Sequence, residues 1–423
     1  MNKEKINLIA ADMGYGHQRA AYPLLDIAVG QKIVTINNYQ GIAGWERRYW
    51  ENSNKTYNKI SRLKKLPLLG DLVFSIMDAF QKVQPFYPKR DLSAPTLQEK
   101  FFYHQVRKGL GKNLINSLRE SALPFVTTFF VGAYFAEEQN HSGDIYCLIT
   151  DTDVSRAWVN MDSKNTRVKY LLPNDRVRER FLMYGVKPEN LKVTGFPLPK
   201  ENVGENDEIL KQDLANRLPY LDPQGCYHKK YQSLVDQHLP AAEKLSKPLT
   251  ITYAVGGAGA QKEIGVQILN GLIDWIKEGR LGLNLIAGSR LEVKEYFDKC
   301  LKEAGVAENK NVRVVFNPDK IEYFKEFNQV LRTTDILWTK PSELSFYAAL
   351  GLPIIMSPVI GSQEVFNREN LLSSGSGLDS LPLEYVTEWF PDLLNSGRLA
   401  RAAMDAYLNG NARGVYNIEA LLN

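Results

Sequence analysis

Short apolar runs alternate with helix-length amphipathic segments in this chain, and the alternation occurs twice. A short apolar run followed by a helical segment predicts a βα unit, and a series of such units predicts a parallel sheet with covering helices. The strands predicted in the first half are Ile6–Ala10, Lys32–Ile36, Phe125–Phe130, Ile145–Thr150, Val168–Leu172 and Leu191–Thr194. The strands predicted in the second half are Leu249–Val255, Leu283–Ala287, Val312–Phe316, Ile336–Trp338 and Pro353–Met356. We therefore expect an α/β protein with two domains, each built on a parallel sheet.

The domain boundaries follow from the same pattern. The first domain is expected to cover residues 1–196 and the second residues 248–423, with terminal helices at its end. Residues 197–247 are rich in proline and charge and contain no strand-like run, so they predict a linker with surface helices. Residues 44–112 interrupt the first domain with helix-like, aromatic sequence. This segment is expected to be a helical insert.

Composition excludes several classes of protein. The net charge of +4 is too small to indicate a nucleic-acid partner. The 3 cysteines form no CxxC pair, which argues against a disulfide scaffold or a thiolate zinc site and favours the cytoplasm. The chain shows no signal peptide, and no apolar run approaches the roughly 20 residues that span a bilayer. We expect a soluble or peripheral protein.

A first glycine loop follows the first predicted strand and reads Asp12-Met13-Gly14-Tyr15-Gly16-His17. Glycines let backbone amides approach a ligand, and the N-terminus of the next helix favours negative charge. The dinucleotide fingerprint G-x-G-x-x-G is incomplete, because Arg19 replaces its third glycine. The next strand is followed by Asn37 and Asn38, where an acidic residue would bind a ribose. A nicotinamide cofactor is therefore disfavoured.

Two further features near that loop predict catalysis. His17 begins the helix after a strand, where α/β sheets bind ligands, and an imidazole with a pKa of about 6.5 can act as a general base. His17 could instead cap the helix or make a local hydrogen bond. Asp151 and Asp153 follow the strand Ile145–Thr150, which predicts either a general base or an orienting partner for His17. Helix capping or a turn explains these aspartates equally well.

A second glycine loop, Gly256-Gly257-Ala258-Gly259-Ala260-Gln261, opens the second domain. The order of strand, glycine loop and helix is typical of phosphate binding. The loop is no Walker motif, since no GK[ST] follows. A tight turn without a ligand is the alternative. Further along, polar residues stand near the starts of two predicted helices. They are Thr339, Lys340, Ser342 and Glu343 at the first helix and Gln363, Glu364 and Asn367 at the second. These polar groups suit phosphate or sugar hydroxyls, or they cap the helices.

Taken in order, six segments of the chain resemble the inverting glycosyltransferases of the GT-B fold. The resemblance is strongest to the diacylglycerol glycosyltransferases and the peptidoglycan N-acetylglucosaminyltransferase. The segments are GYGHQRAA (14–21), LITDTD (148–153), VTGFPL (193–198), VGGAGAQ (255–261), TKPSELSFYAALGLPII (339–355) and GSQEVFN (361–367). They span nearly the whole chain.

This resemblance implies two Rossmann-like domains that face a cleft. It also implies metal-independent, inverting transfer of a sugar from a UDP-sugar to a lipid, polyprenyl-type or other membrane-associated acceptor, with no cofactor beyond the substrate. His17 is then the catalytic base, and Asp151 and Asp153 remain catalytic candidates. Residues 256–261 face the diphosphate, and Gln363, Glu364 and Asn367 face the transferred sugar. The remaining donor-binding candidates are Thr339, Lys340, Ser342 and Glu343, and the acceptor-binding candidates are Gly14, Gly16, Trp45, Tyr49 and Trp50.

The chain departs from the family's pattern at a few positions. Arg156 follows the TDTD segment, where relatives often carry a histidine. Phe346 stands in place of the glutamate expected to hold the nucleotide ribose, which leaves Glu343 as the substitute. An aromatic ring cannot accept hydroxyl hydrogen bonds as a carboxylate does. The alternatives to a transferase are therefore a catalytically silent ligand-binding protein on the same scaffold and a UDP-sugar epimerase.

The insert 44–112 is strongly basic. It contains 14 Lys and Arg against 6 Asp and Glu, a balance of +8, whereas the whole chain carries +4. Its positive charge and its aromatic residues Trp45, Tyr49 and Trp50 lead to the hypothesis that it docks on an anionic membrane surface, at the inner face of the membrane. A solvated helical face is the alternative.

Overall fold

The computed structural model describes residues 5–63, 82–243, 245–256 and 259–422, without the side chains of residues 54–63 and 362. The chain divides into two compact units. Unit 1 comprises Met1–Pro197 and Arg413–Asn423, and unit 2 comprises Leu198–Ala412. The first stretch of unit 1 ends at Pro197, whereas unit 2 begins at Leu198 and not at residue 248, and the last segment of the chain joins unit 1 instead of unit 2.

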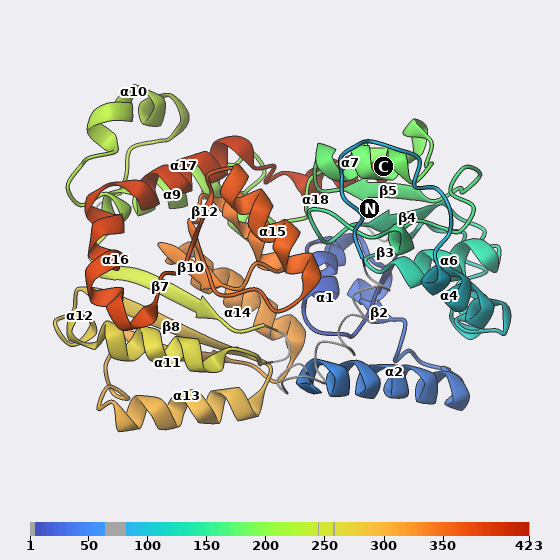
Figure 1. The fold of residues 1–423 in the computed structure, drawn as a ribbon, viewed down its shortest axis with the longest axis horizontal. Helices are drawn as coiled ribbons and strands as arrows, with labels where there is room; N and C mark the ends of the chain where they lie inside the picture. Colours follow the sequence, from blue (N-terminus) through green and yellow to red (C-terminus); the bar gives the residue numbers. More distant parts are fainter. Residues whose placement is uncertain (1–4, 64–81, 244, 257–258, 423) are drawn as a thin grey trace. The chain divides into compact units, whose positions relative to one another are not determined.

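Unit 1 is built on a six-stranded parallel sheet in the order β2-β1-β3-β4-β5-β6 (Figure 1). The strands are β1 (Asn7–Ala10), β2 (Val34–Thr35), β3 (Phe125–Thr127), β4 (Ile145–Leu148), β5 (Lys169–Leu172) and β6 (Leu191–Val193). All six strands predicted from the first half of the sequence are confirmed. The strand β3 is shorter than expected because Thr127 Oγ1 bonds to the backbone of Phe129 and helix α6 begins at Phe130.

Two helices of unit 1, α4 and α7, begin where the sequence supplies a capping side chain. Thr96 and Glu99 form a reciprocal capping box at the start of α4, and the side chain of Asn174 accepts the Val177 N–H at the start of α7. The α-helices are α1 (Gly16–Ala21), α2 (Gly44–Leu63), α4 (Leu97–Arg107), α5 (Lys112–Ser117), α6 (Phe130–Glu138), α7 (Asp175–Met183) and α18 (Gly414–Leu422). The 3-10 helices are η1 (Tyr22–Ile27), η2 (Val29–Gln31), η3 (Arg156–Trp158) and η4 (Pro188–Asn190).

A buried ion pair attaches α4 to the rest of unit 1. Glu99 is fully buried, and its Oε1 lies 2.6 Å from Nη1 of Arg156. Arg156 also donates to backbone carbonyls of Ser93, Val159 and Asn160. Arg156, which stands near the histidine of related sequences, is therefore an architectural residue that holds the basic insert.

Unit 2 is built on a second six-stranded parallel sheet in the order β12-β11-β10-β7-β8-β9. The strands are β7 (Leu249–Ala254), β8 (Leu281–Gly288), β9 (Val312–Phe316), β10 (Ile336–Thr339), β11 (Ile354–Met356) and β12 (Gly377–Asp379). Five of them confirm the predictions, and β12 was missed. The chain therefore contains the two parallel-sheet α/β units that the sequence predicts.

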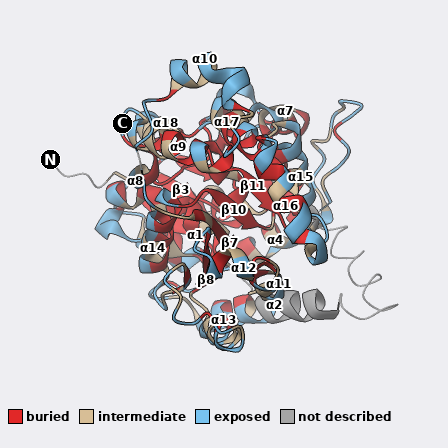
Figure 2. Ribbon diagram, turned by 90° about the vertical axis from the view of Figure 1, so that its left-hand side faces the viewer, coloured by how far each residue is buried: buried red, intermediate tan, exposed pale blue. Residues whose placement is uncertain are grey.

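The predicted linker 197–247 falls in unit 2 from Leu198 onward and is more than a linker. It forms α8 (Lys200–Val203), α9 (Glu208–Leu221) and α10 (His228–His238). Leu214 and Leu221 of α9 are fully buried in the core of unit 2, whereas α10 has no buried residue (Figure 2). α10 is therefore a surface helix, as expected from the sequence, whereas α9 is a core helix.

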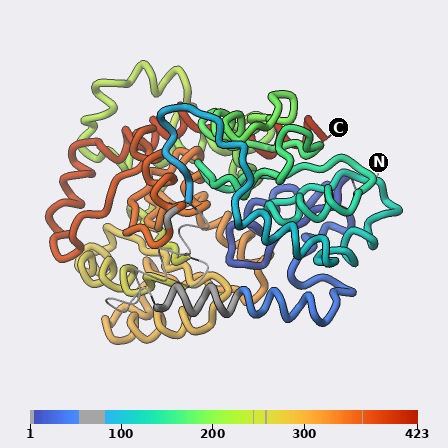
Figure 3. The backbone as a smooth tube through the Cα atoms, turned by 45° about the vertical axis from the view of Figure 1, so that its right-hand side comes forward, coloured from blue at the N-terminus to red at the C-terminus, as the bar shows by residue number. Residues whose placement is uncertain are grey.

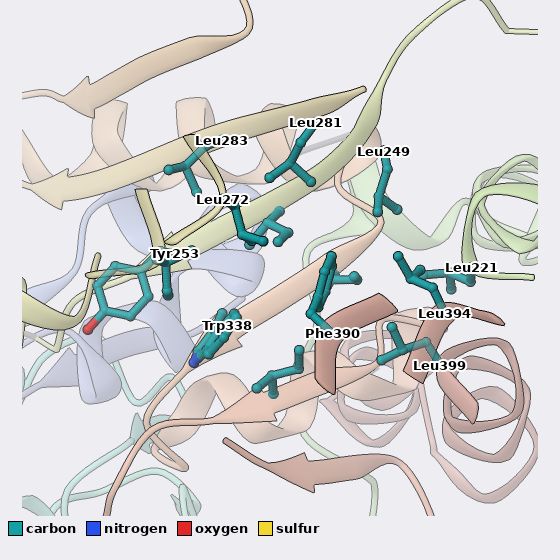
Figure 4. Packing of buried hydrophobic residues seen from close by; sticks show 14 of the residues in the cluster. Leu221, Leu249, Tyr253, Leu272, Leu281, Leu283, Trp338, Phe390, Leu394 and Leu399 are labelled. Carbon is teal, nitrogen blue, oxygen red and sulfur yellow. The ribbon is translucent and has the colours of Figure 1, made fainter. Parts of the chain in front are cut away.

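The remaining helices of unit 2 flank its sheet. They are α11 (Lys262–Gly271), α12 (Ile273–Lys277), α13 (Leu291–Glu303), α14 (Lys320–Arg332), η5 (Glu343–Leu350), α15 (Ser362–Ser373), η6 (Leu383–Tyr385), α16 (Val386–Asn395) and α17 (Arg398–Asn409). Trp338 of β10 is fully buried and packs against Trp389 of α16, with ring centroids 5.6 Å apart. Figure 4 shows Trp338 in the same cluster as Phe390 and Leu249. Burial of such large apolar side chains is the main term that stabilises this unit.

The end of the chain returns to unit 1 through α18. Val415 and Ile418 are fully buried there, and Asn417 Nδ2 donates to the carbonyl oxygen of Thr194 at 2.8 Å. In the tube view the red C-terminal end lies among the elements of unit 1 (Figure 3). Unit 1 is therefore made of two separate stretches of chain.

Candidate functional site

In each sheet the strand order reverses beside the first strand. β1 lies between β2 and β3, and β7 lies between β8 and β10. At such a point neighbouring loops leave the carboxyl ends of the strands in opposite directions, and open α/β sheets bind ligands there. The two glycine loops of the sequence follow β1 and β7. Both predicted loops therefore occupy the position in their own sheet where a ligand is expected.

The loop after β1 is fixed from the neighbouring strand. Asn37 Oδ1 accepts the Asp12 N–H at 3.0 Å, and Asn37 Nδ2 donates to the Asp12 carbonyl at 3.0 Å. Gly14 has φ of +108°, a conformation that side chains other than glycine rarely adopt. Asn37 occupies the position at which dinucleotide-binding proteins carry a ribose-binding acid. Here its side chain instead holds the backbone of the glycine loop at Asp12.

His17 bridges the reversal point of unit 1. Its Nδ1 lies 2.7 Å from the carbonyl oxygen of Thr128, in the loop after β3, and Thr128 Oγ1 donates to the His17 carbonyl at 2.9 Å. A carbonyl oxygen can only accept, so Nδ1 carries the proton in the neutral ring and Nε2 carries the basic lone pair. The ring is half-buried and meets Phe129 edge-on, with centroids 4.9 Å apart. This hydrogen bond runs to the loop after another strand, so it fits both alternatives from the sequence, a catalytic base and a histidine with a structural hydrogen bond.

The two aspartates after β4 differ in their surroundings. Asp153 is buried and forms a two-pronged ion pair with Arg180, with N–O distances of 2.8 and 2.9 Å. It also accepts from Arg176 Nε at 3.2 Å and from the Val154 N–H at 3.0 Å. These contacts fit an architectural role in holding α7. Asp151 is half-buried and lies closer to the carboxyl end of β4, so it stays the better catalytic prediction of the two.

The aromatic acceptor candidates divide between surface and core. Trp45 of α2 is 42% exposed, whereas Trp50 is 6% exposed and packs in the core of unit 1. Tyr49 is half-buried and contacts Trp50 edge-on. Their spacing explains the division, because α2 turns one face to the core. Trp50 therefore packs inside the unit and is not part of a surface.

Gln261, the last residue of the loop after β7, is held by two hydrogen bonds. Tyr253 is buried, which raises the pKa of its phenol well above the ordinary value, and the neutral hydroxyl donates to the Gln261 carbonyl at 2.6 Å. Gln261 Nε2 in turn donates to the Pro358 carbonyl at 2.7 Å. Gly259 has φ of +69°, and a Cβ there would come within 2.9 Å of Val293. Gly257, another donor candidate, lies outside the described residues.

The loop after β10 brings a cation to the same edge of the sheet. Lys340 forms an ion pair with Glu364, at the start of α15. The other oxygen of Glu364 accepts the N–H groups of Ile360 at 2.7 Å and Gly361 at 3.4 Å. Asn367, fully buried, donates to the Pro341 carbonyl at 3.3 Å. Glu364 and Asn367 therefore fasten the loops after β10 and β11 to one another.

The other donor candidates surround this cluster. Thr339 is buried and its hydroxyl donates to the Ala254 carbonyl at 3.1 Å, which joins β10 to β7. Ser342 immediately precedes η5, and Glu343 and Phe346 are half-buried within that helix. Gln363 is half-buried in the first turn of α15. The sequence did not indicate that Thr128 and Asn37 position the first loop, because their contacts are made across strands.

Two kinds of feature are absent from the described residues. No helix among them is both long and apolar enough to cross a membrane. No group of three or more His, Cys, Asp or Glu side chains in the described part of the chain is arranged to hold a metal ion.

Three sets of similar proteins bear on this site. The processive diacylglycerol beta-glucosyltransferase of Bacillus subtilis is 22% identical over 425 residues, which cover 96% of this chain and 93% of that protein. The enzyme of the same name from Bacillus pumilus is 22% identical over 410 residues, covering 92% of this chain and 87% of that protein. A family profile described as a domain of unknown function, DUF6938, matches residues 289–417.

Among solved structures, MurG of Acinetobacter baumannii superposes with a TM-score of 0.51 at 13% identity, covering 99% of each chain. This likeness and the two six-stranded parallel sheets show the GT-B fold. The resemblance to the diacylglycerol glycosyltransferases thus extends over nearly the whole chain.

Proposed function

We propose that this chain, a glycosyltransferase with the GT-B fold, moves a sugar from a UDP-sugar to a lipid acceptor with inversion and without a metal ion. The curated relatives are diacylglycerol glucosyltransferases that match nearly the full length of the chain, which supports both the sugar transfer and the lipid acceptor. The silent binding protein is not favoured by these relatives. A UDP-sugar epimerase would have no use for the basic insert.

The observation that carries the proposal is the geometry of His17. Thr128 fixes the proton on Nδ1, so Nε2 is the atom that takes the proton of the acceptor hydroxyl. In the proposed step the acceptor oxygen forms a bond to the anomeric carbon, the bond from that carbon to the UDP oxygen breaks, and UDP leaves. One displacement on the face opposite the leaving group inverts the anomeric carbon.

Unit 2 is proposed to receive the donor. The loop between β7 and α11 stands at the strand reversal, and the N-terminus of α11 offers partial positive charge to a diphosphate. Such fixed dipoles stabilise the charge that develops on departing UDP. Metal independence is part of the proposal for this reason.

Release of UDP tests this function. Wild-type protein is incubated with UDP-glucose, with and without diacylglycerol in vesicles, and UDP is measured over time. We expect His17→Ala to lower turnover by about 10² to 10⁴, the usual contribution of a general base, while the affinity for UDP stays within about twofold. His228→Ala, an exposed histidine of α10, is the matched control and should keep full activity.

Two outcomes would contradict the proposal in different ways. Full transfer by His17→Ala would remove His17 as the base and direct attention to Asp151. Binding of UDP-glucose by the wild type without release of UDP, with every acceptor lipid tried, would favour the silent binding protein.

A second proposal concerns the membrane. Leu97 and Phe101, one turn apart on α4, are 76% and 52% exposed. Lys100 and Lys108 are exposed beside them, while Tyr103 on the opposite face is buried. We infer that this face of α4 inserts its apolar side chains into an anionic bilayer and sets its lysines against the headgroups.

A further inference from the structure

The reason for a glycine at position 256 lies in a neighbouring side chain. Gly256 is not among the described glycines with positive φ. A Cβ added there would lie 2.5 Å from Cε of Lys340, closer than real Cβ atoms approach, and 3.3 Å from its Nζ. The stem of Lys340 therefore lies directly over the backbone of Gly256. The glycine provides room for a lysine that comes from another strand's loop.

That lysine holds a carboxylate in place. Lys340 is paired with Glu364, and the two side chains are 19% and 11% exposed. The N–H groups of Ile360 and Gly361 hold the other oxygen of the carboxylate. A half-buried ion pair supported by backbone N–H groups has little freedom to rotate, and charge-assisted hydrogen bonds of this kind are stronger than neutral ones. The direction of the Glu364 carboxylate is thus set from both sides.

We propose that Lys340 is a positioning residue that acts through Glu364, and that Gly256 is required so that Lys340 can do so. This inference rests on the proposed function, in which Glu364 accepts hydrogen bonds from hydroxyls of the transferred sugar. Lys340 fixes the carboxylate for those hydroxyls, so its effect falls on the sugar half of the donor. The UDP half is bound without it.

The first experiment removes the ammonium group and keeps the stem. Calorimetry compares UDP and UDP-glucose binding to wild type and Lys340→Met. We expect the affinity for UDP-glucose to fall about tenfold or more, as for a lost hydrogen bond involving a charged group, while the affinity for UDP changes less than about twofold. Lys299→Met, which removes an exposed pair with Glu303 on α13, is the matched control and should change neither affinity.

The second experiment uses the contact with Gly256. In Gly256→Ala the new methyl group meets the far end of a flexible side chain, so Lys340 moves and the fold is retained. We expect the same selective loss of UDP-glucose affinity as in Lys340→Met. In a Lys340→Ala background, Gly256→Ala should add less than about twofold, because the obstructing atoms are gone. This double-mutant cycle reports the coupling between the two positions.

The outcomes separate this inference from the proposed function. Equal loss of UDP and UDP-glucose in Lys340→Met would make Lys340 a phosphate ligand and overturn the inference. Equal effects of Gly256→Ala in both backgrounds would also overturn it. In either case binding by the wild type would still support the proposed function, whereas a wild type that binds neither UDP nor UDP-glucose would overturn the proposed function itself.

Discussion

At the scale of single residues, Asp153 presents the choice between a structural and a catalytic carboxylate. Its partner Arg180 is 0% exposed, so removal of the carboxylate would leave a buried cation without its ion pair. We expect Asp153→Ala to lower the free energy of unfolding by about 3–5 kcal/mol, measured by urea denaturation. Asp144→Ala, which removes an exposed pair with Lys169, should cost no more than about 1 kcal/mol.

The same variant tests catalysis. Where Asp153→Ala remains folded below the midpoint of its urea transition, we expect its UDP release per folded molecule to stay close to that of the wild type. A folded variant of unchanged stability that has lost turnover would assign Asp153 to the reaction instead.

His141 predicts a pH dependence of stability. It is 1% exposed, its Nε2 donates to the Leu123 carbonyl at 2.9 Å, and burial is the main cause that lowers its pKa below 6.5. The unfolded chain therefore binds a proton more readily than the folded chain. The stabilising contribution is complete above about pH 6.5 and is lost as pH falls through the folded pKa.

Urea midpoints between pH 5 and pH 7.5 measure this effect. We expect the wild type to lose stability toward pH 5 and His141→Gln to show a flatter dependence, while His228→Gln keeps the wild-type slope. Identical slopes for His141→Gln and the wild type would show that other groups dominate the titration.

Residue by residue, the sequence indicates candidate groups but not the contacts that those groups make. The glycine loops are recognisable because each follows an apolar strand, and His17 because it stands at the start of the helix after the first loop. The partners of Asp153 were not predictable, since Arg176 and Arg180 lie 23 and 27 residues away in the chain. The same holds for Lys340 over Gly256: nothing local to the glycine indicates a lysine from another loop.

At the scale of elements, the exposed face of α4 predicts binding to anionic vesicles. We expect wild-type protein to sediment with vesicles that contain anionic phosphatidylglycerol, and the double variant Leu97→Ser/Phe101→Ser to bind at least about tenfold more weakly, because each buried apolar side chain contributes about 1.5–3 kcal/mol. Added salt should weaken the wild-type interaction.

The matched control replaces apolar residues elsewhere on the surface. Leu381→Ser in unit 2, at a position that is 49% exposed, should leave sedimentation unchanged. Binding that is the same for neutral and anionic vesicles, or that survives the α4 double variant, would remove α4 as the docking helix.

Elements were predictable where the apolar pattern was long enough. β7 and β8 are mostly apolar, with Thr250 and Thr252 interrupting the first and Asn284 the second, and both were predicted within a few residues. β12 has only Leu378 as a large apolar residue and lies at the edge of its sheet, so it gives almost no pattern. The helix α9 was expected at the surface because prolines and charges surround it, but Leu214 and Leu221 bury it in unit 2.

At the scale of the whole molecule, α18 packs in unit 1, although the sequence just before it forms unit 2. Ile418 is fully buried in unit 1, and we expect Ile418→Ala to lower the free energy of unfolding by about 2–5 kcal/mol. Hydrogen exchange should become faster in β1 and η1 while β7 and β8 keep their protection. Faster exchange in the sheet of unit 2 alone would contradict this division of the chain.

Sequence periodicity predicted two domains because it restarts at β7, and it could not predict the return of α18. A short amphipathic helix at the end of a chain carries no signal that tells which of two apolar surfaces it covers. Only its contacts, such as the bond from Asn417 to Thr194, assign it to unit 1.

The return of α18 also means that, along the chain, unit 2 is a domain inserted into unit 1. The chain leaves unit 1 after Pro197 and re-enters it at Arg413, and close to these crossings a Cβ at Gly414 would lie only 2.1 Å from the carbonyl oxygen of Phe196. The two positions at which unit 1 is interrupted are therefore neighbours, and this arrangement tolerates domain insertion. If a few residues joined Pro197 directly to Arg413, the backbone of unit 1 would need no rerouting. Evolution could therefore exchange the proposed donor unit while the proposed acceptor unit stays intact.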